Sequence, residues 1–310
     1  MKSILKNTNH VKSIKKIAGI SIIAVMVLTG CSTQGKGNLV EMVQIAGGSF
    51  QMGKDLGNAA TGDVTPVHTV TLTDFYMGKY TVTQKQYKAV MGTNPSYFNG
   101  TKGKETAVGE EQGKRPVEQV SWYDAIVFCN ILSMKEGLNP VYSILGSTNP
   151  LAWGVAPTTK NDAIWDAVII VSGANGYRLP TEAQWEYAAK GGDPNAQDWT
   201  GYTYSGSDKI DDVAWISTNS GGITHVVGKK APNVLGLYDM SGNVWEWCWD
   251  WNGAYEDTAQ TDPAGAVSGT DRISRSGGYG HSAATSRSVR RSIDPPSYTD
   301  INLGFRLVRQ

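Results

Sequence analysis

Four tryptophans form the most regular pattern of the chain, close to its C-terminal third. They occupy every second position of one stretch: Trp245, Trp247, Trp249 and Trp251. Because successive side chains of a strand point to opposite faces, this period predicts an extended segment whose indoles share one face and form the floor of a core. Gly242 and Asn243 predict a turn before it. Asn243 and Glu246 should be hydrogen-bonded or metal-bound, because burying them unpaired costs about 1–3 kcal/mol.

Polar residues ahead of apolar runs predict three helix starts. The cap patterns are Thr83-x-x-Gln86, Ser121-x-x-Asp124 and Thr181-x-x-Gln184. The second helix has the apolar spacing of an amphipathic helix up to Leu132 and should end at Gly137, and the third should end at the glycine pair 191–192 with a left-handed cap. Short extended runs such as 69–73 lie between Gly, Asn, Ser and Pro residues. The pattern predicts an α+β domain with little regular secondary structure.

The N-terminal segment has the pattern of an export signal. Residues 1–30 contain five Lys and no acidic residue, and their apolar run, 17–28, is too short to span a membrane stably. The run ends in Leu-Thr-Gly-Cys, which resembles a bacterial lipoprotein cleavage site with Cys31 as the lipidated residue. Ser32 follows, and the absence of Asp there resembles lipoproteins sent to the outer membrane or cell surface. The alternative is a plain secretory signal. Residues 31–42 would then be a tether, and residues 43–310 one domain.

Removing the signal changes the charge of the chain. The 28 basic and 28 acidic residues become 23 and 28, a net charge of about −5. No basic stripe remains, so we expect no nucleic-acid partner. The two remaining cysteines, Cys129 and Cys248, exclude a disulfide-dense scaffold, and the sequence leaves open whether they are buried thiols or a single bridge.

Six segments together resemble the formylglycine-generating enzyme (sulfatase-modifying factor) family, in that family's order. They are GGSFQMG at 47–53, FYMGKYTVTQKQY at 75–87, PVEQVSWYDAIVFCN at 116–130, YRLPTEAQWEYAAKGG at 177–192, GLYDMSGNVWEWCWDW at 236–251 and LGFRLV at 303–308. The resemblance implies an α+β fold of the C-type-lectin-like type. Residues 139–170 fit the family least and predict an inserted hairpin or surface excursion.

The resemblance also implies what chemistry is missing. The family's enzymes oxidise a substrate cysteine with copper held by two cysteines near the C-terminus. Those positions match His281 and the vicinity of Ser286, and no cysteine follows Cys248. A thiolate pair is what selects Cu(I), so we expect no copper and no catalytic residue. The alternative is a formylglycine-generating-type oxidase or a related enzyme.

Calcium is the one metal that the resemblance leaves open. A structural calcium site of the family's enzymes matches Asn243, Val244 and Glu246, and a carboxylate with carbonyl oxygens suits this hard cation. The alternative is that Glu246 is a core carboxylate hydrogen-bonded to backbone. The histidines left after export have no metal-ligand spacing: His68, His225 and His281.

The C-terminal stretch 274–303 has an unusual composition. It contains no Lys, Gln, Glu, Met or Trp, although these types number 58 of 310 in the chain, so five or six would be expected. Every residue type present can be encoded by a codon ending in a pyrimidine, the set expected if AAY codons were randomised at adenines. The stretch resembles the variable region of diversity-generating retroelements, whose target proteins carry this lectin-like fold. The alternative is an ordinary Ser/Arg-rich surface loop.

The resemblance divides this stretch into scaffold positions and candidate ligand contacts. The scaffold positions are Ala283, Arg287, Ser288, Arg291 and Pro296. The candidate contacts are Tyr279, His281, Ser282, Ala284, Thr285, Ser286, Arg290, Ser292, Ile293, Asp294, Tyr298, Asp300 and Ile301. Variation is tolerable only if these side chains face solvent, since truncation of core side chains costs about 2–5 kcal/mol. The sequence thus predicts a lipid-anchored, non-catalytic surface protein that binds a protein or glycan ligand through this stretch.

Overall fold

The computed structural model describes residues 38–54, 64–160, 162–198 and 200–310. Contacts divide the chain into Met1–Gly37 and Asn38–Gln310. The predicted export signal and Cys31 therefore lie outside the described residues. The folded unit begins earlier than the predicted boundary at residue 43, because Val40 is already buried in the core. Within the described ranges, no helix is both long enough and apolar enough to cross a membrane.

The three predicted helices are present and begin where their caps indicate. They are α1 (Gln84–Met91), α2 (Trp122–Lys135) and α4 (Glu182–Ala189), with complete capping boxes at Thr83, Ser121 and Thr181. Gly191 and Gly192 follow α4 with φ of 93° and 87°, the predicted left-handed end. The remaining helices are single turns: η2 (Gln112–Lys114), η3 (Pro150–Ala152), α3 (Ala163–Asp166), α5 (Ile210–Val213) and η4 (Ala283–Ser286).

Short strands form small sheets, as the α+β prediction requires. One sheet has the order β1 (Met42–Ile45), β4 (Phe75–Gly78), β12 (Val308–Arg309), and a second has the order β2 (Gly48–Met52), β3 (His68–Leu72), β8 (Gln260–Thr261). The four-stranded sheet has the order β10 (Ser292–Asp294), β9 (Arg272–Arg275), β7 (Trp245–Trp251), β11 (Leu303–Phe305). In it β7 runs antiparallel to β9 and parallel to β11.

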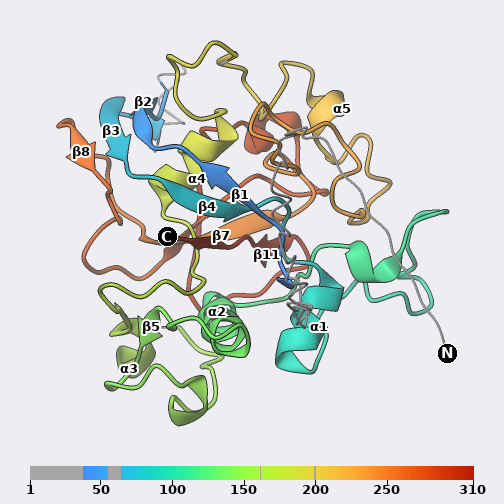
Figure 1. The fold of residues 1–310 in the computed structure, drawn as a ribbon. Helices are drawn as coiled ribbons and strands as arrows, with labels where there is room; N and C mark the ends of the chain where they lie inside the picture. The colour runs from blue at the N-terminus through green and yellow to red at the C-terminus, as the bar shows by residue number, and fades with distance from the viewer. Residues whose placement is uncertain (1–37, 55–63, 161, 199) are drawn as a thin grey trace, which may run out of the picture. The chain divides into compact units, whose positions relative to one another are not determined.

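Strand β7 is buried on both faces and separates two apolar clusters. Trp245, Trp247 and the partly exposed Trp249 pack with α2 and β11, whereas Cys248 packs with α4 and β4. Figure 1 shows β7 at the centre of the fold, between β4 and α2. The predicted alternation is therefore confirmed for Trp245, Trp247 and Trp249, whereas Trp251, beyond a register shift in the pairing with β9, belongs to neither cluster. The same partition keeps Cys248 away from Cys129, which lies in the first cluster, so both thiols are free. Burial raises the pKa of both thiols, which makes them inert.

Helix α2 buries the predicted apolar positions Ala125, Phe128, Cys129 and Leu132, and segment 139–170 packs against part of its surface. The hydroxyl of Tyr123 donates to Asp166 Oδ1 at 2.6 Å, and Asn130 Nδ2 donates to the carbonyl of Tyr142 at 2.7 Å. The opposite side of α2 is half-buried at Asp124, Val127 and Ile131 and exposed at Met134 and Lys135, so the helix buries one side, as predicted. Within this segment, β5 (Tyr142–Ser143) pairs antiparallel with β6 (Ile169–Ile170), and η3 and α3 lie between them, so its ends pair as in the predicted excursion but it is not a simple hairpin.

Candidate functional site

The C-terminal stretch is tied to the four-stranded sheet at both ends. It starts in β9, passes through η4 and β10, and ends at β11. Strand β10 is an edge strand of the sheet, paired with β9 from Ser292 to Asp294. A sheet that holds both ends of a loop keeps its backbone in place when the loop side chains change. Such a loop is suited to form a binding surface.

Buried ion pairs also fix this stretch to α4. The Arg275 Nη2 atom lies 2.6 Å from Glu186 Oε2, and its Nε lies 3.0 Å from Glu182 Oε1. Arg291 Nη2 lies 2.8 Å from the other oxygen of Glu182. Burial acts to raise the pKa of Glu186, but Lys190 and Arg275 outweigh it and hold the pKa below its ordinary value. Because breaking a buried pair strands a charge, these residues form a fixed frame.

A polar concavity of about 340 Å³ lies at the surface of the stretch. Seven of the thirteen candidate contacts line it, and none of the seven is buried: His281, Thr285, Arg290, Ser292, Asp294, Tyr298 and Asp300. Trp245, Asn302 and Leu303 complete the wall. The sequence pattern predicts Trp245 as a core residue. The candidate contacts end at Ile301 and omit Asn302, because the family pattern resumes at Leu303. Only the pairing of β7 with β11 brings Trp245 to this wall.

Two carboxylates dominate one side of the concavity. Asp300 Oδ1 accepts from the backbone N–H and the Nδ2 of Asn302 at 2.8 and 2.9 Å, and its Oδ2 accepts from the Tyr298 hydroxyl at 3.2 Å. Burial, together with the negative charge of Asp300 and Asp271, raises the pKa of Asp294 to about 6. Near pH 7 this side therefore presents negatively charged acceptors.

The other lining side chains add donors and an aromatic surface. Arg290 lines the concavity, and the ring of His281 packs edge-on against Trp245 with centroids 5.8 Å apart. Burial lowers the pKa of His281 despite the opposing charge of Asp300, so the ring is neutral at pH 7. Carboxylates, a guanidinium, hydroxyls and an indole in one small concavity can hydrogen-bond and pack against a polar ligand.

The remaining six candidate contacts divide into two groups. Ser282, Ala284 and Ile293 are exposed and Ile301 is half-buried, so these four border the concavity or lie on the open surface. Tyr279 and Ser286 are buried, and the prediction that they face solvent is wrong. The ring of Tyr279 packs edge-on against Phe98 with centroids 5.2 Å apart. The hydroxyl of Ser286 lies so close to Gly277 that a Cβ there would be 2.4 Å away.

The calcium set implied by the resemblance does not fit a cation. Glu246 is fully buried, and both oxygens face Arg306, with Nη2 to Oε1 at 2.9 Å and Nε to Oε2 at 3.0 Å. Thr81 Oγ1 and Trp185 Nε1 donate to the same carboxylate at 2.6 and 2.7 Å. A guanidinium thus occupies the place where a cation would bind. The alternative, a core carboxylate hydrogen-bonded to backbone, correctly predicts that Glu246 is buried. Its donors, however, are side chains and not backbone N–H groups.

Asn243, another member of that set, is also engaged. The side-chain oxygen of Asn243 accepts from the His225 backbone N–H at 3.0 Å, and its Nδ2 donates to the His225 carbonyl at 3.0 Å. Val244 has a fully buried side chain. Over the residues that the structure describes, no group of three or more His, Cys, Asp or Glu side chains is placed to hold a metal ion.

The fold and these motifs place the chain among known proteins. Residues 29–310 match the model of the sulfatase-modifying factor enzyme 1-like domain. The chain belongs to this family. Its C-type-lectin-like α+β fold, expected from the resemblance, is therefore confirmed. The formylglycine-generating enzyme of Streptomyces coelicolor is 30% identical over 85% of this chain and 87% of that protein.

Two proteins whose names are not those of enzymes are more similar to this chain than the Streptomyces enzyme is. The chaperone protein LppX of Paenibacillus barcinonensis is 41% identical, over 93% of this chain and 96% of that protein. The solved structure of Treponema denticola variable protein 1 is also 41% identical, with a TM-score of 0.77, over 86% of this chain and 94% of that one. The predicted kinship with a variable protein is thus confirmed.

Proposed function

We propose that this protein is a lipid-anchored surface protein that binds a protein or a glycan through its C-terminal stretch and has no catalytic activity. The anchor would be Cys31, following the predicted cleavage site. The observation that carries the proposal is the 340 Å³ concavity, because seven candidate contacts from separate parts of the stretch converge on it. A fixed scaffold that presents side chains of restricted composition at its surface is what a variable binding site requires.

Two further observations support the proposal. None of the candidate contacts at the concavity is buried, whereas Arg275 and Arg291 beneath the stretch are buried and paired. Substitution at the surface therefore leaves the frame intact. Similarity to a solved variable protein is in keeping with a site that differs between copies of one scaffold.

The second candidate function is a formylglycine-generating-type oxidation, favoured by the similarity to enzymes of that name. The chain has no cysteine after Cys248. Cys129 and Cys248 are buried in different apolar clusters. We therefore expect no conversion of cysteine to formylglycine when the protein is incubated with copper and a sulfatase peptide. Product detected by mass spectrometry would overturn the non-catalytic proposal.

The coding DNA gives a direct test of variation. A near-copy of the codons for residues 274–303, differing only at positions that are adenine in the copy, should lie close to the gene and to a reverse transcriptase. Its absence would remove the argument for diversification and leave the binding role to be judged from the protein alone.

The binding role is tested on the full-length protein with paired substitutions. Asp300→Asn and Tyr298→Ala alter the concavity, whereas Thr299→Ala changes an exposed neighbour that does not line it. Each variant should melt within a few degrees of the parent, since surface substitutions stay within about 0.5 kcal/mol. Screening on a glycan array and against surface proteins should show ligand lost with the first two and kept with the third. Equal binding by all variants would contradict the proposed site.

A further inference from the structure

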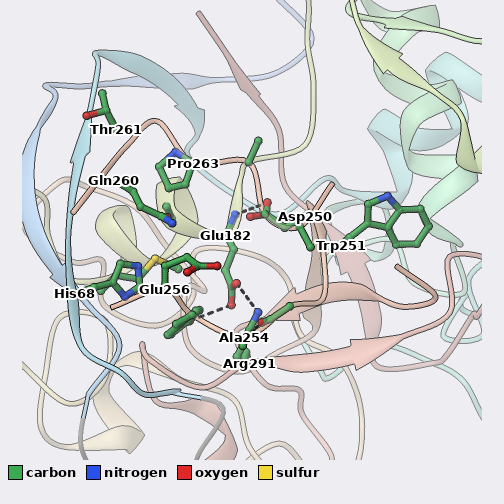
Figure 2. A pocket seen from close by; sticks show the side chains of 17 residues that line it. His68, Glu182, Asp250, Trp251, Ala254, Glu256, Gln260, Thr261, Pro263 and Arg291 are labelled. Carbon is green, nitrogen blue, oxygen red and sulfur yellow. Dashed lines mark hydrogen bonds and ion pairs between the residues drawn. The ribbon is translucent and has the colours of Figure 1, made fainter. Parts of the chain in front are cut away.

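A second and larger cavity, of about 560 Å³, lies away from the concavity of the C-terminal stretch. Its walls come from β3, the start of α4 and the segment after β7 (Figure 2). None of the thirteen candidate contacts lines it. Arg291 borders this cavity, while its neighbour Arg290 borders the other one. The two sites are therefore distinct, and a ligand of this cavity would be independent of the proposed function.

The positive charge at this cavity is already engaged by Glu182. Arg291 Nη2 and Arg275 Nε contact the two oxygens of Glu182 at 2.8 and 3.0 Å, and the Tyr255 hydroxyl donates to it at 3.3 Å. Arg291 Nη1 donates to the carbonyl of Gly253 at 2.9 Å. The lining as a whole holds three carboxylates, Glu182, Asp250 and Glu256, and one guanidinium, Arg291, so it does not favour an anionic ligand.

Asp250 is the second buried carboxylate of this cavity, and the charges of Arg291 and Arg272 act on it. Its side chain is 4% exposed, and Oδ2 accepts the backbone N–H of Glu182 at 2.8 Å. Burial, together with the charge of Glu182, raises the pKa of Asp250 to about 7, although the charges of Arg291 and Arg272 act to lower it. A cationic group of a ligand placed beside this buried carboxylate would favour its charged form.

His68 and Glu256 supply two more acceptors on the opposite side. His68 is 4% exposed, and its Nδ1 lies 3.1 Å from the carbonyl of Pro66, which can only accept; Nδ1 therefore carries the proton in the neutral ring and leaves Nε2 as an acceptor. Glu256 is exposed. Figure 2 shows His68 and Glu256 facing the space between them and Glu182, with Asp250 across from them.

Between these acceptors the walls are apolar. Trp251, Pro263 and Ala254 line the cavity together with the acceptors. The cavity is large enough for a small ligand. Its negatively charged acceptors match a ligand with several N–H donors, and the apolar walls between them match an alkyl chain. Among the described residues no three metal-ligating side chains come together here, so the arrangement does not favour a metal ion.

We propose that this cavity binds an organic cation, a primary ammonium or guanidinium group on an alkyl chain, with Asp250 and Glu256 as its counter-charges and His68 as a further acceptor. A lysine or arginine side chain of a partner and a free diamine share this chemistry.

Calorimetry on the full-length protein tests the class of ligand and separates its two sources. N-acetyl-lysine methylamide represents the side chain, 1,5-diaminopentane the free amine, and N-acetyl-norleucine methylamide the same alkyl chain without charge. We expect the lysine compound to bind at least about tenfold more tightly than the norleucine compound. Binding of the diamine alone would support the class and identify a free amine as the source. No binding by either amine, or equal binding by norleucine, would overturn the proposal.

Substitutions locate the binding in this cavity. Glu256→Gln removes an exposed lining charge and should weaken amine binding several-fold, whereas Asp257→Asn removes a neighbouring exposed charge that does not line the cavity and should change nothing. Asp250→Asn keeps an oxygen for the Glu182 N–H and should abolish measurable binding. Circular dichroism checks that this variant is folded. Amine binding that persists in both lining variants would place the site elsewhere and refute the assignment.

Discussion

Replacing Arg306 with Met tests whether a buried ion pair, not a metal ion, holds the centre of the fold. Arg306 is fully buried and contacts both oxygens of Glu246. Its Nη1 and Nη2 also donate to the carbonyls of Gly78 and Tyr238 at 2.7 and 2.6 Å. Among the described residues, the substitution leaves Glu246 with the neutral donors of Thr81 and Trp185.

The expected cost comes from the carboxylate that the substitution leaves unpaired. Removing one partner of a buried pair costs about 3–5 kcal/mol, because the remaining charge is buried without compensation. For a domain of this size that corresponds to a fall in Tm of roughly 10 °C.

Urea unfolding followed by tryptophan fluorescence measures this cost, with the slope checked for constancy. Lys88→Met, which removes an exposed cation on α1, is the matched control and should stay within about 0.5 kcal/mol. The double variant Glu246→Gln, Arg306→Met should be more stable than Arg306→Met alone, because it buries no charge. A cost below about 1 kcal/mol for Arg306→Met, or a large fall in the parent's Tm on adding EDTA, would refute the reasoning and restore a metal site at Glu246.

Three further predictions concern other parts of the chain. Tyr279→Ala should lower the free energy of unfolding by about 3 kcal/mol, because the buried ring of Tyr279 packs on Phe98. Tyr298→Ala, at an exposed position, should change this free energy by less than about 0.5 kcal/mol. Urea unfolding of the two variants compares these values. Asp250 has a pKa of about 7 in the folded protein, above its ordinary 3.8. Its contribution to the free energy of unfolding is therefore fully present below pH 3.8 and is lost as the pH rises through 7. The parent should therefore lose up to about 4 kcal/mol between pH 4 and pH 8, and a Tm that falls as steeply in Asp250→Asn would contradict this. Cys31→Ser should move the protein from the membrane fraction to the soluble one, and retention at the membrane would exclude a lipid anchor at Cys31.

The sequence alone predicted the elements that depend on neighbouring residues. Thr83, Ser121 and Thr181 cap their helices through bonds that reach only three residues along the chain, so the pattern is visible without any tertiary contact. The period of two in β7 likewise comes from strand geometry, whatever the strand packs against. The family segments add the order of the fold, and composition singled out 274–303 as the stretch whose side chains later meet at the concavity.

Only the tertiary structure decided what depends on distant partners. Glu246 and Arg306 are 60 residues apart, so the sequence left Glu246 between a metal ligand and a core carboxylate until the pairing of β7 with β11 brought the guanidinium to it. Tyr279 belongs by composition to the variable stretch, yet Phe98, from another part of the chain, buries it. The separation of Cys129 from Cys248 and the cavity around Asp250 likewise come from segments that meet only in the folded chain. The physical reason is the same in each case: local hydrogen bonds are set by neighbours along the chain, whereas burial and charge pairing are set by which segments the topology places side by side.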